Sequence, residues 1–264
     1  MKINRYNIET SKEGINLKIA CISDLHARPH GKVLSALRNV SPDLILLAGD
    51  IFEIAAPYMN KRNQSALDFV RKCVDIAPTY YTKGNHEIFY SHARMGHQKT
   101  PDTKLEEEYS EKIRNCGVII LNDDFAAFSL PDNNTKILIG GAVCGKDKDP
   151  SINEPDFNVE FINRFDGAGD SFKILLCHYP HYYEKYLKDT SLDIVLSGHA
   201  HGGQFRLPFV GGLIAPNQGL FPKYAGGEYE KNGTTMIVSR GLARRMDIVP
   251  RIFNPPELVV ITVS

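Results

Sequence analysis

Short polar segments that carry metal-binding side chains follow apolar runs or glycine turns at five places in this chain. Five of the nine histidines fall within these segments, which random scatter would rarely produce. In open α/β sheets, ligands gather beyond the carboxyl ends of the strands. The chain must therefore fold so that the five segments meet, and we expect a site for two metal ions there. The segments are 24–26 (Asp-Leu-His), 49–50 (Gly-Asp), 84–87 (Gly-Asn-His-Glu), 178 (His) and 198–201 (Gly-His-Ala-His).

Apolar runs rich in β-branched residues predict the strands. Most are continuous rather than alternating, so both faces of the sheets should be covered. Helical patterns lie between them, and the first half reads β-α-β-α-β, which favours parallel strands joined by right-handed crossovers. The sequence therefore predicts an α/β fold. The expected strands are 17–22, 44–48, 79–82, 118–121, 137–139, 173–177, 194–196, 236–238 and 258–263, and the expected helices are 32–40, 64–74, 104–115 and 181–188.

Two further segments have a distinct composition. Residues 1–13 are mostly polar and predict an edge strand without the apolar core of a signal peptide. Residues 202–227 are crowded with Gly and Pro, which is typical of a long irregular loop, here at the lip of the site. No linker divides the chain, so we expect a single domain over 1–264.

Charge and cysteine content narrow the function. The 31 Lys and Arg residues cancel the 31 Asp and Glu residues, so no overall field attracts long nucleic acid or an anionic membrane, although a local basic rim remains open. We therefore expect a small-molecule substrate and no transmembrane segment. The five cysteines are odd in number and widely spaced, which favours reduced thiols and a cytoplasmic location. Cys177 precedes His178, and we interpret it as a buried apolar residue rather than a ligand.

The types of donor side chain indicate the chemistry. Asp24 and His26 are two residues apart, as are His199 and His201. In extended backbone this spacing points both side chains to one side, so each pair could hold one ion. Imidazole, carboxylate and amide donors without thiolate suit Mn, Fe, Zn or Ni rather than a structural zinc site. Two ions about 3.5 to 4 Å apart can activate water for phosphoester hydrolysis. The bland alternative is a set of capping and turn residues at strand ends.

The order D-x-H, G-D, G-N-H-E, H, G-H-x-H resembles the calcineurin-like metallophosphoesterase superfamily. The segments 198–204, 219–224, 239–241 and 255–257 resemble its YkuE/YaeI-like branch of bacterial phosphoesterases. The resemblance covers the chain from about Tyr6 to the C-terminus. It implies a four-layer αββα sandwich of two mixed β-sheets flanked by helices. It also implies a metal-dependent phosphoric ester hydrolase of class EC 3.1, and within that class we expect a phosphodiesterase.

The resemblance also implies a role for each matching residue. Asp50 would bridge two divalent ions, of which we expect Mn, with Fe, Zn, Ni or Co as alternatives. A metal-bridging hydroxide would attack phosphorus, and His86 would be the general acid that protonates the leaving oxygen. Glu53 and Glu87 would orient ligands. The first ion would be held by Asp24, His26, Asp50 and His201, and the second by Asp50, Asn85, His178 and His199.

Some alternatives remain open. Purple acid phosphatases carry a tyrosine where this chain has Glu53. The YkuE-like branch commonly begins with an export signal or a membrane anchor, and we expect neither in residues 1–13. A catalytically silent scaffold and a nuclease of the same superfamily are the rival functions. His86 could merely bond the backbone. Arg28, Arg244 and Arg245 either contact substrate phosphate or lie in solvent. The substrate, the preference for mono- or diesters, the native metal and the oligomeric state are not fixed by the sequence.

Overall fold

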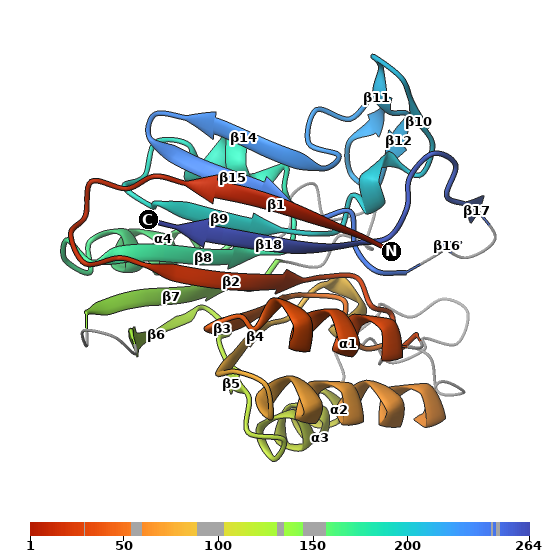
Figure 1. The fold of residues 1–264 in the computed structure, drawn as a ribbon, viewed down its shortest axis with the longest axis horizontal. Coiled ribbons are helices and arrows are strands. Elements are labelled where there is room, and N and C mark those ends of the chain that lie inside the picture. Colours follow the sequence, from red (N-terminus) through yellow and green to blue (C-terminus); the bar gives the residue numbers. More distant parts are fainter. Residues whose placement is uncertain are drawn as a thin grey trace.

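Two mixed sheets form the centre of this computed structural model, which describes residues 1–28, 30–53, 60–88, 103–130, 135–144, 157–243, 245–246 and 249–264 (Figure 1). Each sheet has six strands among the described residues. In the first, β2, β3, β4 and β5 are parallel, and β18 runs antiparallel to β2 and parallel to β1. Its order is β1 (Lys2–Ile8), β18 (Glu257–Val263), β2 (Leu17–Ile22), β3 (Leu44–Ala48), β4 (Thr79–Thr82) and β5 (Ile119–Ile120).

The second sheet has a parallel centre and antiparallel edges. Strands β15, β9, β8 and β7 are parallel, while β14 and β6 pair antiparallel at the two edges. Its order is β14 (Gly227–Lys231), β15 (Thr234–Val238), β9 (Ile194–Ser197), β8 (Phe172–Cys177), β7 (Lys136–Ala142) and β6 (Asp124–Ser129).

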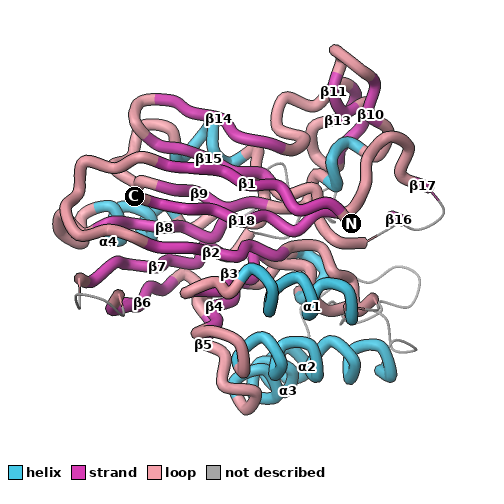
Figure 2. The backbone as a smooth tube through the Cα atoms, viewed as in Figure 1, coloured by secondary structure: helices cyan, strands magenta, loops and turns pink. Residues whose placement is uncertain are grey.

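Three apolar clusters hold four layers together. Along β2, Ile19 and Cys21 face the second sheet, while Ala20 and Ile22 face the helices, because successive side chains of a strand alternate. Helices α1 (Gly31–Val40), α2 (Asn60–Val74) and α3 (Thr103–Arg114) cover the first sheet, as Figure 2 shows. Helix α4 (Val159–Asp166) and the π-helix η3 (Tyr183–Leu187) cover the second. The expected αββα sandwich is confirmed.

The sequence patterns did not predict strands β6 and β14 or helix α4. Strands β6 and β14 lie at sheet edges and are largely exposed, so they lack the continuous apolar runs of the central strands. Helix α4 begins where the side chain of Asn158 accepts a hydrogen bond from the backbone N–H of Phe161. The helix expected at 181–188 is the π-helix η3. The N-terminal edge strand is confirmed as β1.

The expectation of an irregular loop over 202–227 is wrong. This segment forms two short antiparallel hairpins after the turn η4 (His201–Gly203), with three-residue turns in which Phe209 and Asn217 adopt positive φ. The hairpin strands are β10 (Arg206–Leu207), β11 (Gly211–Gly212), β12 (Ile214–Ala215) and β13 (Gly219–Leu220). Within the described ranges, no helix combines the length and apolar character that crossing a bilayer requires.

Candidate metal centre

The five polar segments meet where β2, β3 and β4 of one sheet and β8 and β9 of the other reach their carboxyl ends. Backbone hydrogen bonds join neighbouring segments: the N–H of Asp24 donates to Gly49 O at 3.0 Å, and the N–H of His26 donates to Asp50 O at 2.9 Å. Across the two sheets, the N–H of His199 donates to Asp24 Oδ1 at 3.0 Å. The turns at the strand ends are therefore built as one unit.

The donor atoms of the predicted ligands lie in two adjacent groups. Asp24, His26 and His201 form one group, in which Nε2 of His201 lies 3.4 Å from Asp24 Oδ1 and 3.3 Å from His26 Nε2. Asp50, His178 and His199 form the other. Oδ2 of Asp50 lies 3.1 Å from His178 Nε2 and 3.8 Å from His26 Nε2. The carboxylate of Asp50 therefore lies between the two groups.

Three buried side-chain atoms of predicted ligands have no hydrogen-bond partner: Oδ2 of Asp50, Oδ1 of Asn85 and Nε2 of His178. Oδ2 of Asp50 and Nε2 of His178 lie 3.1 Å apart, so they form an ion pair when the imidazole is protonated. Buried polar atoms are almost always partnered, and an ion is one of the accepted explanations for those that are not. Carboxylate, amide and imidazole donors suit divalent transition metals. The residues present thus fit a pair of divalent cations.

Most of the predicted ligands have a left-handed backbone. Non-glycine residues rarely adopt positive φ, and strained backbone concentrates at functional sites. The extended backbone expected at both two-residue spacings is therefore wrong, and so is the pairing of His199 with His201, whereas Asp24 and His26 do share one group. His201 joins Asp24 and His26, whereas His199 joins Asp50 and His178, because the turn between the two histidines sends their side chains to different groups. The φ angles are 51° at Asp24, 51° at His26, 53° at Asp50, 65° at His199 and 47° at His201.

Glycines at two strand ends allow this close approach. Gly49 has φ of +83°, and a Cβ there would lie 2.5 Å from Nδ1 of His178. A Cβ at Gly84 would contact the carboxylate of Asp50. Any larger residue at Gly84 would therefore displace the side chain that lies between the two groups.

Glu87 fixes the backbone beneath the site. Its buried carboxylate accepts hydrogen bonds from the N–H groups of Asp50 (2.9 Å), Phe52 (2.8 Å) and Gly84 (2.8 Å). Burial, together with the nearby charge of Asp50, raises the pKa of Glu87 to about 6. Glu87 thus holds two strand-end turns in register rather than facing the donor atoms.

Glu53 connects the metal centre to the predicted general acid. Its Oε1 lies 2.5 Å from Nδ1 of His26, and its Oε2 lies 2.9 Å from Nδ1 of His86. Burial alone would raise the pKa of Glu53, but the hydrogen bonds to both histidines bring it to about 2. Both rings are thereby oriented with Nε2 toward Asp50 Oδ2, at 3.8 Å for His26 and 4.0 Å for His86.

Replacing Glu53 with Gln is expected to weaken metal affinity or activity by about 10- to 100-fold, the usual effect of losing a carboxylate that orients a ligand. The neutral amide cannot accept from both imidazole rings while keeping them in place. Metal titration against a chromophoric chelator and the rate on bis-p-nitrophenyl phosphate measure both effects. The exposed Glu111→Gln serves as the control, and equal values for the two variants would argue against this role of Glu53.

The charges of the side chains favour a bound cation between the two groups of predicted ligands. Burial would lower the pKa of His178, but Asp50 raises it to about 10. Burial raises the pKa of Asp24. Burial and the neighbouring His178 lower the pKa of His199 to about 3, so this imidazole is a neutral donor. Two buried carboxylates surrounded by such rings form an environment that a cation would stabilise.

Two further residues contact the predicted ligands without belonging to any motif. Oδ1 of Asn217, in the turn between β12 and β13, lies 2.9 Å from Nε2 of His199. If this oxygen accepts a hydrogen bond from a protonated Nε2, the other ring nitrogen, Nδ1, is the one that can bind a metal ion. The partly buried Arg251 places Nη2 3.3 Å from Nδ1 of His201. Both reach the site through tertiary packing, which no local pattern reveals.

The remaining candidates stand as follows. The partly buried Arg28 donates its backbone N–H to Leu25 O. Arg244 and the side chain of Arg245 lie outside the described residues. Cys177 is buried with its Sγ 3.8 Å from that of Cys144, as expected for an apolar core position.

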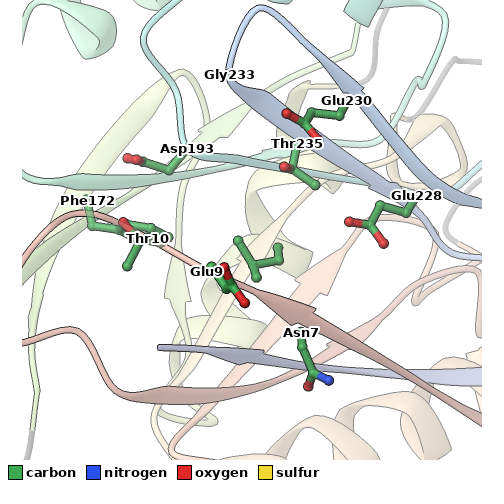
Figure 3. Close-up of a pocket in the computed structure, with 10 residues that line it drawn as sticks. Asn7, Glu9, Thr10, Phe172, Asp193, Glu228, Glu230, Gly233 and Thr235 are labelled. Carbon is green, nitrogen blue, oxygen red and sulfur yellow. The ribbon is translucent and has the colours of Figure 1, made fainter.

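A separate cavity of about 270 Å³ lies away from these donors (Figure 3). Phe172 at the start of β8 lines it, whereas His178 follows the end of the same strand, roughly 20 Å away at the usual rise per residue. Its acidic lining comes from Glu9, Asp193, Glu228 and Glu230, and Asp193 is paired with Lys12 at 2.6 Å. None of the predicted ligands borders this cavity.

Comparisons with known proteins agree with the site. The sequence profile of the calcineurin-like phosphoesterase family matches residues 17–203. The chain is similar to the uncharacterized metallophosphoesterase YkuE of Bacillus subtilis, with 28% identity over 94% of this chain and 79% of that protein. It is also similar to phosphodiesterase YaeI of Escherichia coli, with 26% identity over 75% of this chain and 66% of that protein. Among solved structures, the phosphopantetheinyl hydrolase of Mycobacterium tuberculosis shares the fold, with a TM-score of 0.51 and 12% identity over 85% of this chain and 89% of that one.

Proposed function

This chain belongs to the calcineurin-like phosphoesterase family, and from that premise we propose that it hydrolyses a P–O bond of a phosphodiester with two divalent cations. The observation that carries the proposal is the pair of adjacent buried groups of metal-binding side chains, Asp24, His26 and His201 in one and Asp50, His178 and His199 in the other. The similarity to phosphodiesterase YaeI supports a diester as the substrate class.

The residues would divide the work as follows. Asp24, His26, Asp50 and His201 would hold one cation, and Asp50, Asn85, His178 and His199 the other. Bound divalent cations neutralise phosphoryl oxygens and lower the pKa of water. His86 lies at the rim with its side chain 26% exposed, close enough to solvent for a substrate to reach Nε2. With Nδ1 held by Glu53, the protonated ring would donate from Nε2 to the leaving oxygen.

The two rival functions are less well supported. A silent scaffold has no use for two adjacent groups of buried metal-binding side chains. A nuclease is less well supported because a chain with no net charge exerts no overall attraction on long nucleic acid, although arginines gather locally in 240–256.

Removal and return of metal test the proposal. Protein stripped with EDTA is expected to show no turnover of bis-p-nitrophenyl phosphate, because the activated water and the charge neutralisation are both lost. Activity should return with Mn²⁺, or with one of Fe²⁺, Co²⁺, Ni²⁺ and Zn²⁺, at two ions per chain by inductively coupled plasma mass spectrometry. Faster turnover of the diester than of p-nitrophenyl phosphate would support a diesterase.

Failure with all five metals, while ions still bind, would favour the scaffold. Steeply salt-dependent binding of duplex DNA would favour the nuclease.

A further inference from the structure

Exposed apolar side chains gather on the two hairpins and the nearby segment 252–253. Single exposed apolar residues are normal on a protein surface, but a contiguous set marks an interaction site. Phe209 is fully exposed, and Phe253, Leu220 and Phe221 are 77%, 72% and 67% exposed. We call this set the apolar collar; it consists of Leu207, Phe209, Val210, Ile214, Leu220, Phe221, Ile252 and Phe253.

Backbone hydrogen bonds place the segments of the apolar collar side by side. The N–H of Arg206 donates to Ile252 O at 3.0 Å, which joins the first hairpin to 252–253. The N–H of Leu213 donates to Phe205 O at 2.9 Å, and the N–H of Phe221 donates to Leu213 O at 2.8 Å. The two hairpins and 252–253 therefore form one connected surface, on which the β10–β11 hairpin projects beyond the sandwich (Figure 1).

The three phenylalanines occupy backbone positions that do not suit them. Phe209, Phe221 and Phe253 have φ angles of 65°, 53° and 52°, in the left-handed region that Gly and Asn favour. A bulky residue there costs backbone energy, and these side chains gain little burial in return. Strain of this kind points to a function outside the fold.

The sequence of the segments around the apolar collar is poor in acidic residues, which favours an anionic partner over a cationic one. Residues 205–227 contain no Asp or Glu, and 240–256 contain four arginines and a single acid, Asp247, in a chain with no net charge. Lys223 is paired with Glu184 and Arg240 with Glu257. Arg206 in β10 is partly buried and donates to Gly202 O at 3.1 Å, and Arg251 is partly buried beside His201. Arg244 and the side chain of Arg245 lie outside the described residues.

We propose that the apolar collar inserts into the headgroup layer of a lipid bilayer that carries anionic lipids. Aromatic side chains suit the interface between water and hydrocarbon, and neighbouring cations are attracted to anionic headgroups. Phe209 protrudes so far that no neighbouring group shades it. A protruding side chain enters a fluid layer directly, whereas a protein partner would have to supply a matching hollow.

The apolar collar adjoins the metal centre. Asn254 follows Phe253 and donates to His201 O at 2.7 Å, and Asn217, between β12 and β13, contacts His199 at 2.9 Å. Docking would therefore bring the opening of the metal centre to the level of lipid headgroups. The proposal concerns binding, so it stands or falls independently of hydrolysis.

Vesicle flotation of the full chain tests this proposal. Wild-type protein should float with vesicles of phosphatidylcholine and phosphatidylglycerol, and less with phosphatidylcholine alone. The triple variant Phe209→Asn, Phe221→Asn and Phe253→Asn should partition roughly 10²-fold more weakly, because the burial of three aromatic side chains is lost. Asparagine tolerates left-handed backbone, so the melting temperature should stay the same or rise.

The matched control removes exposed apolar side chains elsewhere. Ile119 and Val159 are both 44% exposed and lie outside the apolar collar. The double variant Ile119→Thr and Val159→Thr should float like the wild type. Failure of the wild type to float, or undiminished flotation of the folded triple variant, would overturn the proposal. So would a wild-type dimer in light scattering that the triple variant loses while neither protein floats, because the occupant would then be a second copy of the chain.

Discussion

Replacing Asp50 with Asn is expected to lower the rate on bis-p-nitrophenyl phosphate by about 10³-fold, from the loss of several kcal/mol of charge stabilisation. Oδ2 of Asp50 lies between the two donor groups, so one substitution removes negative charge from both. The amide keeps the shape of the side chain. Its Oδ1 can still accept the hydrogen bond that the backbone N–H of His86 donates to Asp50 Oδ1 in the wild type, at 2.9 Å. The fold should therefore survive, and bound metal should fall below two ions per chain.

The exposed Asp170→Asn provides the matched control, with the same chemical change far from the donor groups. Circular dichroism and metal analysis accompany the rates. Retention of two ions and of near wild-type turnover by Asp50→Asn would show that this carboxylate is not shared.

The central strands could be predicted because burial on both faces leaves a continuous apolar run. Strands β2, β3 and β4 begin and end at the expected residues. The same runs located the donor segments, since each predicted ligand follows a strand end or its turn. Edge strands such as β14 bury little apolar area, so their sequence does not distinguish them from loops.

The sequence spacing did not predict which metal-binding side chains would group together in the metal centre. A two-residue spacing predicts side chains on one side only in extended backbone, but His199 and His201 adopt left-handed φ. Which group each histidine joins therefore depends on turn geometry, which is set by contacts with Asp24 and Asn217. Asn217 and Arg251 lie in segments without a motif. Only the folded chain brings them to the site.

Glu53 shows why the site behaves as one unit. A single carboxylate orients both His26, a predicted ligand, and His86, the predicted general acid. The two imidazole rings also contact each other edge to face, with their centroids 4.5 Å apart. Effects of substitutions at these residues should therefore be non-additive. A test of His86 needs a measurement that a simple disturbance of the ligands would not reproduce.

Dependence on the leaving group is such a measurement. His86→Ala is expected to slow the hydrolysis of a methyl phenyl phosphodiester by about 10²- to 10⁴-fold, the range for losing a general acid. The loss on methyl p-nitrophenyl phosphate should be far smaller, because nitrophenolate leaves without a proton. A series of substituted phenols should therefore give a steeper dependence of rate on phenol pKa in the variant than in the wild type.

If His86 had only a structural role, His86→Ala would lower the hydrolysis rate by the same factor for every phenol in the series. The backbone N–H of residue 86 still donates to Asp50 after the substitution, so any role of the main chain is preserved in the variant. His30→Ala, which removes an imidazole outside both donor groups, should leave the slope and the rates unchanged. Parallel lines for wild type and His86→Ala would assign proton donation to water or to another group. A steeper line for the variant would assign it to Nε2 of His86, because Nδ1 is the ring nitrogen that contacts Glu53.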